Sequence, residues 1–150
     1  MGIENDIRQQ HFRNEYQKAG INLIYTFNWM TEKMKIFLDQ HDITSQQFNI
    51  LRILRGAKQP LSTLQIRDRM LDKMSDTSRI VDRLLKKGLV KKAICEEDRR
   101  LVDITITKEG KNLLKKLDAS SHEMDEVLNN LSDEEAKTLN KLLDKIRSAE

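Results

Sequence analysis

The hydrophobic pattern of the chain changes its period in one stretch, and that change most constrains the fold. Along most of the chain, apolar residues recur every three or four positions, the spacing of an amphipathic helix. Within residues 89–107 the spacing approaches two, most clearly in residues 103–106, where Ile alternates with Asp and Thr. This alternation predicts two short strands joined by a charged tip at residues 96–100. The fold is therefore expected to be mainly α, with a small two- or three-strand β-wing.

Composition excludes several classes of protein. A chain of 150 residues is long enough for one domain with its own core. Its one cysteine, Cys95, rules out an intramolecular disulfide and any multi-cysteine zinc site. No apolar run approaches the roughly 18 residues of a membrane span, and residues 1–10 lack the apolar core of a signal peptide. A cytoplasmic protein is expected.

Helical patterns occupy both sides of the predicted hairpin. Within residues 1–40 an apolar stripe predicts a long helix, whose apolar face either packs in the core or is lent to a second subunit. The stripe consists of Ile21, Ile24, Tyr25, Phe27, Met30, Met34, Phe37 and Leu38. Thr44 and Ser62 are the predicted N-caps of the next two helices. A further helix is predicted to begin at Ser75, with Asp76 in its first turn, and to end before Gly88.

Two helices are expected after the hairpin. Thr107 is the predicted cap of the first, which carries apolar residues as far as Leu128 and is broken at residues 129–130. Residues 132–135, Ser-Asp-Glu-Glu, are a strong capping box for the last helix. The spacing of their apolar residues allows the two helices to fold back as a hairpin.

The net charge of +3 is unevenly distributed. It is zero over residues 1–40, +2 over 41–60, +6 over 61–117 and −5 over 118–150. A basic centre with an acidic tail suggests that the middle of the chain binds a polyanion. The alternative is a uniformly solvated surface on which charges cluster by chance.

The centre of the chain resembles a known family. Residues 61–70 (LSTLQIRDRM), 75–90 (SDTSRIVDRLLKKGLV) and 98–114 (DRRLVDITITKEGKNLL) resemble the support helix, recognition helix and wing of MarR-family (multiple antibiotic resistance) transcriptional regulators. The capped final helix also matches. The departures are conservative, with Ile106 where the family usually has Leu and Ser78 where Thr is common.

The resemblance implies a winged helix-turn-helix protein that works as a homodimer. Residues 1–40 would be an N-terminal helical dimerisation region, residues 41–107 the DNA-binding lobe, and residues 108–150 the C-terminal dimerisation helices of one compact protomer. Dimerisation is also expected physically, because one helix reads too few base pairs for useful specificity and a two-fold dimer doubles the site.

Short polar and basic side chains near the start of the recognition helix suit base edges in the major groove. The candidates are Ser75, Thr77, Ser78, Arg79, Arg83 and Lys86. Thr77 is among those expected to look outward. Arg79 is predicted to contact a base edge, and the alternative is that it pairs with an acid. Arg83 and Lys86 are expected to contact phosphates. Asp82 is predicted to pair with Arg79 or Arg83.

The predicted wing tip supplies the second group of DNA contacts. An arginine gains from the negative potential of a narrow minor groove. By resemblance, Asp98 braces the tip by pairing with Arg100, and one arginine inserts. Whether Arg99 or Arg100 inserts is left open by the sequence, and a solvated hairpin tip is the alternative.

The resemblance also implies a small, often aromatic or phenolic, effector bound between the dimer helices and the DNA-binding lobe. Candidates to line that cleft are Tyr25, Trp29, His41 and Arg52. Core packing is the alternative for the two aromatic residues.

No arrangement of residues indicates catalysis, a cofactor or a metal. The three histidines, His11, His41 and His122, form no spaced pair, and Cys95 is interpreted as a small strand residue. The sequence therefore predicts a non-enzymatic, sequence-specific DNA-binding regulator, a repressor that a small molecule releases. The alternative is a winged-helix protein-interaction module without specific DNA binding.

Overall fold

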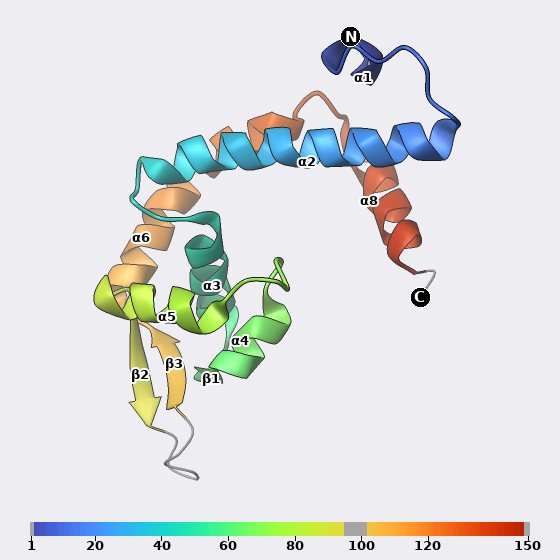
Figure 1. Cartoon of the computed structure of the whole chain (residues 1–150). Coiled ribbons are helices and arrows are strands. Elements are labelled where there is room, and N and C mark those ends of the chain that lie inside the picture. The colour runs from blue at the N-terminus through green and yellow to red at the C-terminus, as the bar shows by residue number, and fades with distance from the viewer. Residues whose placement is uncertain (1, 95–101, 149–150) are drawn as a thin grey trace.

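The computed structural model describes residues 2–94 and 102–148 (Figure 1). The described elements, in chain order, are α1 (Ile3–Asp6), α2 (Glu15–Asp39), α3 (Ser45–Gly56), β1 (Leu61–Ser62), α4 (Thr63–Arg69), α5 (Thr77–Lys86), β2 (Val90–Ile94), β3 (Val102–Ile106), α6 (Lys108–Ala119), α7 (Ser121–Asp125), the 3-10 turn η1 (Glu126–Leu128) and α8 (Asp133–Arg147). This mainly helical fold with one small sheet confirms the expected fold class. Within the described ranges, no helix is long and apolar enough to cross a membrane.

The sheet has three antiparallel strands in the order β1-β3-β2. The predicted hairpin is formed by β2 and β3, which pair from Val90 opposite Ile106 to Ile94 opposite Val102. The third strand is β1, where Leu61 pairs with Ile104. The hairpin projects from the end of the molecule opposite α2 (Figure 1). The two-strand alternative is therefore excluded by a pairing between residues far apart in sequence.

Most helix starts lie where the capping pattern predicts them. Thr44, Ser62, Thr107 and Ser132 each accept a hydrogen bond from the backbone N–H three residues later. The start of α5 is a correction, because the N-cap is Asp76 and not Ser75. Both residue types cap helices well, and the backbone places the Asp76 carboxylate within reach of the third amide of the helix.

The core lies among α3, α4, α5, α6 and the sheet, joined by the C-terminal end of α2. Its fully buried side chains are Leu38, Ile50, Leu51, Leu61, Ile66, Met70, Leu84, Ile104, Leu114 and Leu117. Burial of each such side chain contributes about 1.5–3 kcal/mol. In contrast, α2 buries only Phe37 and Leu38, so most of its apolar stripe does not belong to the core of the protomer.

The single helix expected between Thr107 and Leu128 is interrupted, which corrects the sequence interpretation. α6 ends at Ala119, and Ser120 leaves the helical region with φ −106° and ψ 14° before α7 begins. The bend lays α7 against α2 and brings Met124 onto the core. Because apolar residues keep helical spacing through the bend, the pattern did not reveal it.

The expected hairpin of the last two helices is also not formed. α8 buries none of its residues, and it stands apart from α6 in Figure 1. The physical reason is that the apolar stripe of α6, including Leu114 and Leu117, is already used in the core. α6 therefore offers α8 no free apolar face on which to pack.

Candidate nucleic-acid interface

A helix-turn-helix is formed by α4 and α5, which pack against each other and against α3. Side chains hold the turn between them. The backbone N–H of Leu71 donates to Asn49 Oδ1 at 2.9 Å, and that of Met74 donates to Asp72 Oδ1 at 3.0 Å. The first bond holds the turn against α3 and the second orders the turn itself, and together they fix where α5 begins.

The helix α5 has one buried and one exposed face. Val81 and Leu84 are buried in the core, and Thr77 lies on the same face because these positions repeat every three or four residues. The exposed face carries Ser78, Arg79, Asp82, Arg83 and Lys86. The outward-facing predictions for Ser78, Arg83 and Lys86 agree with this arrangement.

The outward orientation predicted for Thr77 is wrong. Thr77 is only 4% exposed, and its Oγ1 is buried without a hydrogen-bond partner among the described residues. Ser75 is half-buried, and its Oγ is in the same condition. The two hydroxyl groups therefore face the interior at the start of α5, while Ser78 is the short hydroxyl side chain that faces solvent.

Arg79 forms an ion pair with Asp76, and not with Asp82 as one of the sequence predictions had it. Its Nε lies 3.2 Å from Asp76 Oδ2, and both side chains are largely exposed, Arg79 by 81%. Asp82 forms no ion pair within the part of the chain that the structure describes. An exposed pair of this kind contributes only about 0–1 kcal/mol, so Arg79 can leave Asp76 for a stronger partner at little cost.

Two further cations extend the basic face along α5. Arg83 and Lys86 are exposed, and neither has an ion-pair partner among residues 2–94 and 102–148. The adjoining strand β2 carries Lys91 and Lys92, also exposed. Successive strand residues point to opposite faces, so only one of these two lysines can continue the basic face of α5.

The tip of the wing lies outside the described residues. Asp98, Arg99 and Arg100 fall in the range 95–101, as does Cys95, so the predictions for them stay predictions. The described strands run up to the Ile94–Val102 pair on either side of this range.

The four candidate effector residues are not brought together in the protomer. Tyr25 and Trp29 are exposed on α2, so neither packs in the core. The His41 ring lies against Phe37, with centroids 5.8 Å apart, and the Arg52 guanidinium lies 5.6 Å from the centre of a Phe48 ring.

A separate cavity of about 170 Å³ lies where α2 meets α7. Its lining is mostly apolar and includes Met30, Met34, Phe37 and Met124. None of the four predicted cleft residues lines it. The described residues contain no cluster of three or more side chains able to hold a metal ion.

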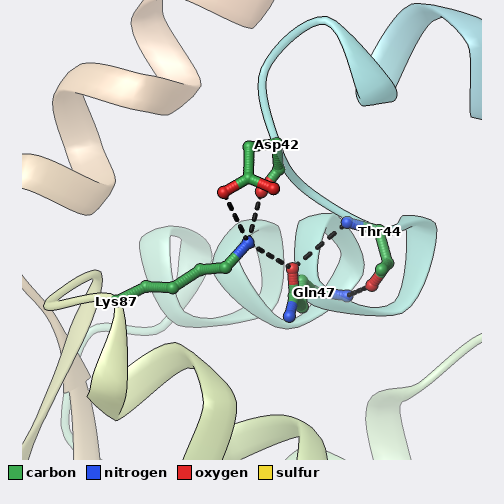
Figure 2. Close-up of polar contacts among 4 residues, drawn as sticks. All are labelled: Asp42, Thr44, Gln47 and Lys87. Carbon is green, nitrogen blue, oxygen red and sulfur yellow. Dashed lines mark hydrogen bonds and ion pairs between the residues drawn. The ribbon is translucent and has the colours of Figure 1, made fainter.

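A polar cluster that no sequence pattern predicted lies at the C-terminal end of α5 (Figure 2). There Lys87 directly follows α5 and donates to Asp42 and to Gln47, which lie 45 and 40 residues earlier. Separations of this size have no local pattern by which sequence reasoning could find them.

Large apolar side chains remain exposed on the terminal helices. They include Ile24, Phe27 and Ile36 on α2, and Leu142 and Ile146 on α8. Exposed apolar surface on this scale is typical of an interaction site.

Comparison with known proteins places the chain among helix-turn-helix regulators. Residues 41–101 match the model of the MarR family. The chain is 30% identical to the HTH-type transcriptional regulator PecS of Dickeya dadantii over 95% of its own length and 91% of PecS. It is 32% identical to the uncharacterized HTH-type transcriptional regulator YfiV of Bacillus subtilis, with a match that covers 54% of this chain and only 50% of YfiV.

Solved structures share the fold over most of the chain. A MarR transcription factor from Planctomyces limnophilus is 32% identical, with a TM-score of 0.68 over 89% of this chain and 98% of that one. A mutant MarR from E. coli, complexed with operator DNA, is 24% identical, with a TM-score of 0.78 over 91% and 99% of the two chains. BpsR of Bordetella bronchiseptica, whose DNA binding is regulated by 6-hydroxynicotinic acid, is 18% identical, with a TM-score of 0.80 over 93% and 100%.

Together, the three-strand wing, the helix-turn-helix and the basic face of α5 define a winged helix-turn-helix protein. The near full-length similarity to PecS and to the Planctomyces factor identifies one family within this class of protein. The chain belongs to the MarR family of transcriptional regulators, a family of regulators and not of enzymes.

Proposed function

We propose that this protein is a repressor that binds a pseudo-palindromic operator as a homodimer, with α5 in the major groove and the wing in the minor groove. The observation that carries the proposal is the exposed basic face of α5, held in place by a turn bonded to α3. The shared fold of the E. coli protein complexed with operator DNA supports it.

In this proposal the recognition residues divide by role. Arg79, near the N-terminus of α5, reads a base edge after leaving Asp76, because bidentate contacts from arginine to guanine discriminate well in the major groove. Ser78 faces the same groove, and Arg83 and Lys86 contact phosphates further along the helix. Such phosphate contacts position the protein, whereas base contacts specify the sequence.

The dimer is proposed to form through the terminal helices. Residues 1–40 and 108–150 supply the interface and residues 41–107 form the DNA-binding lobe, with α6 packed into the core of that lobe. Phe27 is 67% exposed in the protomer and Ile146 is 61% exposed, so both would lose apolar surface to water on association. A two-fold dimer would place its half-sites about 34 Å apart on the duplex.

Selection of bound duplexes from a random pool, followed by polarisation titration, tests this proposal. We expect a palindromic consensus, bound at least about a thousandfold more tightly than unrelated DNA at physiological salt. The specific-regulator proposal is wrong if binding shows no sequence preference under these conditions. A transcription assay from a promoter that carries the selected site then tests repression.

Arg79→Ala tests the base contact directly. It should relax base preference by about 1–3 kcal/mol at one position in each half-site. Arg147→Ala is the matched control, because Arg147 forms an exposed ion pair with Asp144 at the same spacing on α8. If Arg79→Ala weakens binding to every sequence equally, then Arg79 contacts phosphate only.

The wing is tested by the double substitution Arg99→Ala/Arg100→Ala. When log K is plotted against the logarithm of the salt concentration, each phosphate that the protein neutralises makes the slope steeper by about 0.9. The double variant should therefore show a shallower slope than the wild type. An unchanged slope would mean that the wing does not touch DNA.

Release by a small molecule is the final part of the proposal. The effector cleft is proposed to comprise Tyr25, Trp29, His41 and Arg52, completed by helices of the partner, and BpsR provides a precedent in a protein of the same fold. Trp29 is the only tryptophan in the sequence, so quenching of its fluorescence reports binding. The ligand must also weaken DNA binding, because only differential affinity for the two states shifts the equilibrium. Small aromatic acids that leave both signals unchanged would contradict the proposal.

One observation favours the second candidate, a protein-interaction module. The turn before α5 exposes Leu71 by 89% and Met74 by 93%, and both are held on a hydrogen-bonded backbone. Exposed apolar residues on a rigid turn suit a protein partner. Failure to bind any duplex at low salt would favour this alternative over the regulator.

A further inference from the structure

We propose that Lys87 is a positioning residue that fixes the angle between α2 and the recognition helix α5, and so sets the half-site spacing that the dimer accepts. The inference rests on the proposed function, because it concerns how the dimer fits its operator. Its basis is the polar cluster of Asp42, Thr44, Gln47 and Lys87 (Figure 2).

The helix α2 ends in a turn with a left-handed residue. Asp42 has φ 51°, its N–H donates to Asp39 O at 3.2 Å, and the N–H of Ile43 donates to Leu38 O at 3.4 Å. This is the pattern of a Schellman turn, where glycine is usual. Aspartate is among the few other residues that adopt this conformation, and unlike glycine it brings a carboxylate to the turn.

The helix α5 ends in a turn of the same kind. Gly88 has φ 69°, its N–H donates to Leu85 O at 3.0 Å, and the N–H of Leu89 donates to Leu84 O at 3.1 Å. Lys87 directly precedes this glycine. It therefore stands at the junction between the recognition helix and the wing.

The Lys87 side chain joins the two turns. Its Nζ donates to the backbone carbonyl of Asp42, lies 3.4 Å from Asp42 Oδ2, and lies 3.4 Å from Gln47 Oε1. An ammonium group has three N–H donors, so these three oxygens match its full capacity. One side chain thus connects the end of α2, the start of α3 and the end of α5.

Gln47 makes this connection firm on the side of α3. It is buried, and its Oε1 also accepts from the backbone N–H of Thr44 at 3.2 Å, as part of the capping box of α3. An amide oxygen has two lone pairs, and here one serves the helix cap and the other serves Lys87. The apolar residues Leu38 and Ile43 anchor the same segment in the core. The three contacts of the Lys87 ammonium group, called the tie below, add directional polar bonds to a junction that packing already holds.

The angle at this junction matters because α2 is long. Its 25 residues span about 37 Å, and in the proposed dimer they link each DNA-binding lobe to the two-fold axis. A rotation of about 10° about this junction moves the far end of α5, whose 10 residues span about 15 Å, by about 2.6 Å, most of one base-pair step along DNA. The contacts of Lys87 must therefore hold the angle between α2 and α5 to a few degrees if the dimer is to distinguish operators by their half-site spacing.

The test compares two operators for each variant. One is the palindrome selected from random duplexes by the wild-type protein, and the other is the same palindrome with one base pair inserted between its half-sites. We expect wild type to bind the spaced duplex about tenfold more weakly or worse. Lys87→Met should reduce that ratio about two- to fivefold, and Lys87→Arg should restore it, because it keeps the charge and the donors.

Lys35→Met is the matched control. It removes an exposed ion pair between lysine and Asp39 that lies wholly within α2. The inference is overturned if Lys87→Met leaves the ratio unchanged or if Lys35→Met shifts it equally. Lack of sequence preference in the wild type would instead contradict the proposed function.

A second measurement needs no DNA. Spin labels are attached at Glu32→Cys on α2 and Arg83→Cys on α5 in a Cys95→Ser background, and labelled chains are diluted with unlabelled protein. Lys87→Met should broaden the distribution of distances between the labels within one chain. An unchanged distribution would overturn the inference even if no operator were found.

Discussion

Replacing Gly110 by alanine tests how tightly α6 is seated against the junction of the recognition helix and the wing. A Cβ built at this position would lie 2.3 Å from the backbone oxygen of Leu89 and 2.8 Å from Ile106 Cγ1. The Leu89 oxygen cannot simply move aside, because it accepts the N–H of Thr107 at 3.1 Å. The added methyl group therefore forces the first turn of α6 away from the sheet.

The magnitude follows from two opposing contributions. Alanine has the higher helix propensity, which favours the variant by up to about 1 kcal/mol. Overpacking typically costs about 1–3 kcal/mol, and contact with a backbone atom places Gly110→Ala at the upper end. We expect the free energy of unfolding to fall by about 2 kcal/mol.

The assay is urea unfolding followed by circular dichroism, with the free energy obtained by linear extrapolation. Protein concentration is held fixed, since association alters apparent stability. Gly56→Ala, at the end of α3, is the control, because its Cβ would have no heavy atom within 4 Å. It should be neutral or slightly stabilising. If Gly110→Ala is as stable as this control, then α6 is not seated as described.

Three further substitutions probe the interface, the recognition helix and α8. Phe27→Glu should weaken dimerisation by about a hundredfold or more, because two-fold symmetry places the change in the interface twice; sedimentation measures this, and an unchanged dimer would remove Phe27 from the interface. Thr77→Val should raise the free energy of unfolding by about 1 kcal/mol, since a buried hydroxyl without a partner is lost at nearly constant shape; a drop in DNA affinity would instead show that Thr77 contacts DNA. Bonds from the Ser132 backbone N–H and hydroxyl lower the pKa of Glu135, so the cap of α8 should stabilise the fold above the ordinary glutamate pKa and lose this effect as pH falls through the lowered value. Carboxyl NMR titration should show the Glu135 pKa rising part of the way towards its ordinary range in Ser132→Ala, because the backbone N–H remains and only the hydroxyl bond is lost; an unmoved pKa would contradict the hydroxyl bond.

Local features of the structure were predictable from the chain alone. The change of period at residues 89–107 located the strands β2 and β3, because alternation and helical spacing are properties of neighbouring residues. The caps at Thr44, Ser62 and Ser132 could be predicted equally well, since each joins residues three positions apart. The exposed face of α5, with Ser78, Arg83 and Lys86, also followed from helical spacing. Thr77 was assigned to the wrong face, because its position at the very start of the helix depended on where the cap falls.

Tertiary structure decided the features that depend on distant partners. The third strand exists because Leu61 meets Ile104, and α6 stops at Ala119 because α7 packs on α2. The hydroxyl of Thr77 is buried because α5 presses that face onto the core. The tie from Lys87 to Asp42 joins two helix ends 45 residues apart. The sequence by itself determined the class of fold and the exposed face of α5, because those depend on local periodicity. The angles between helices depend on contacts between distant residues and exist only in the folded chain.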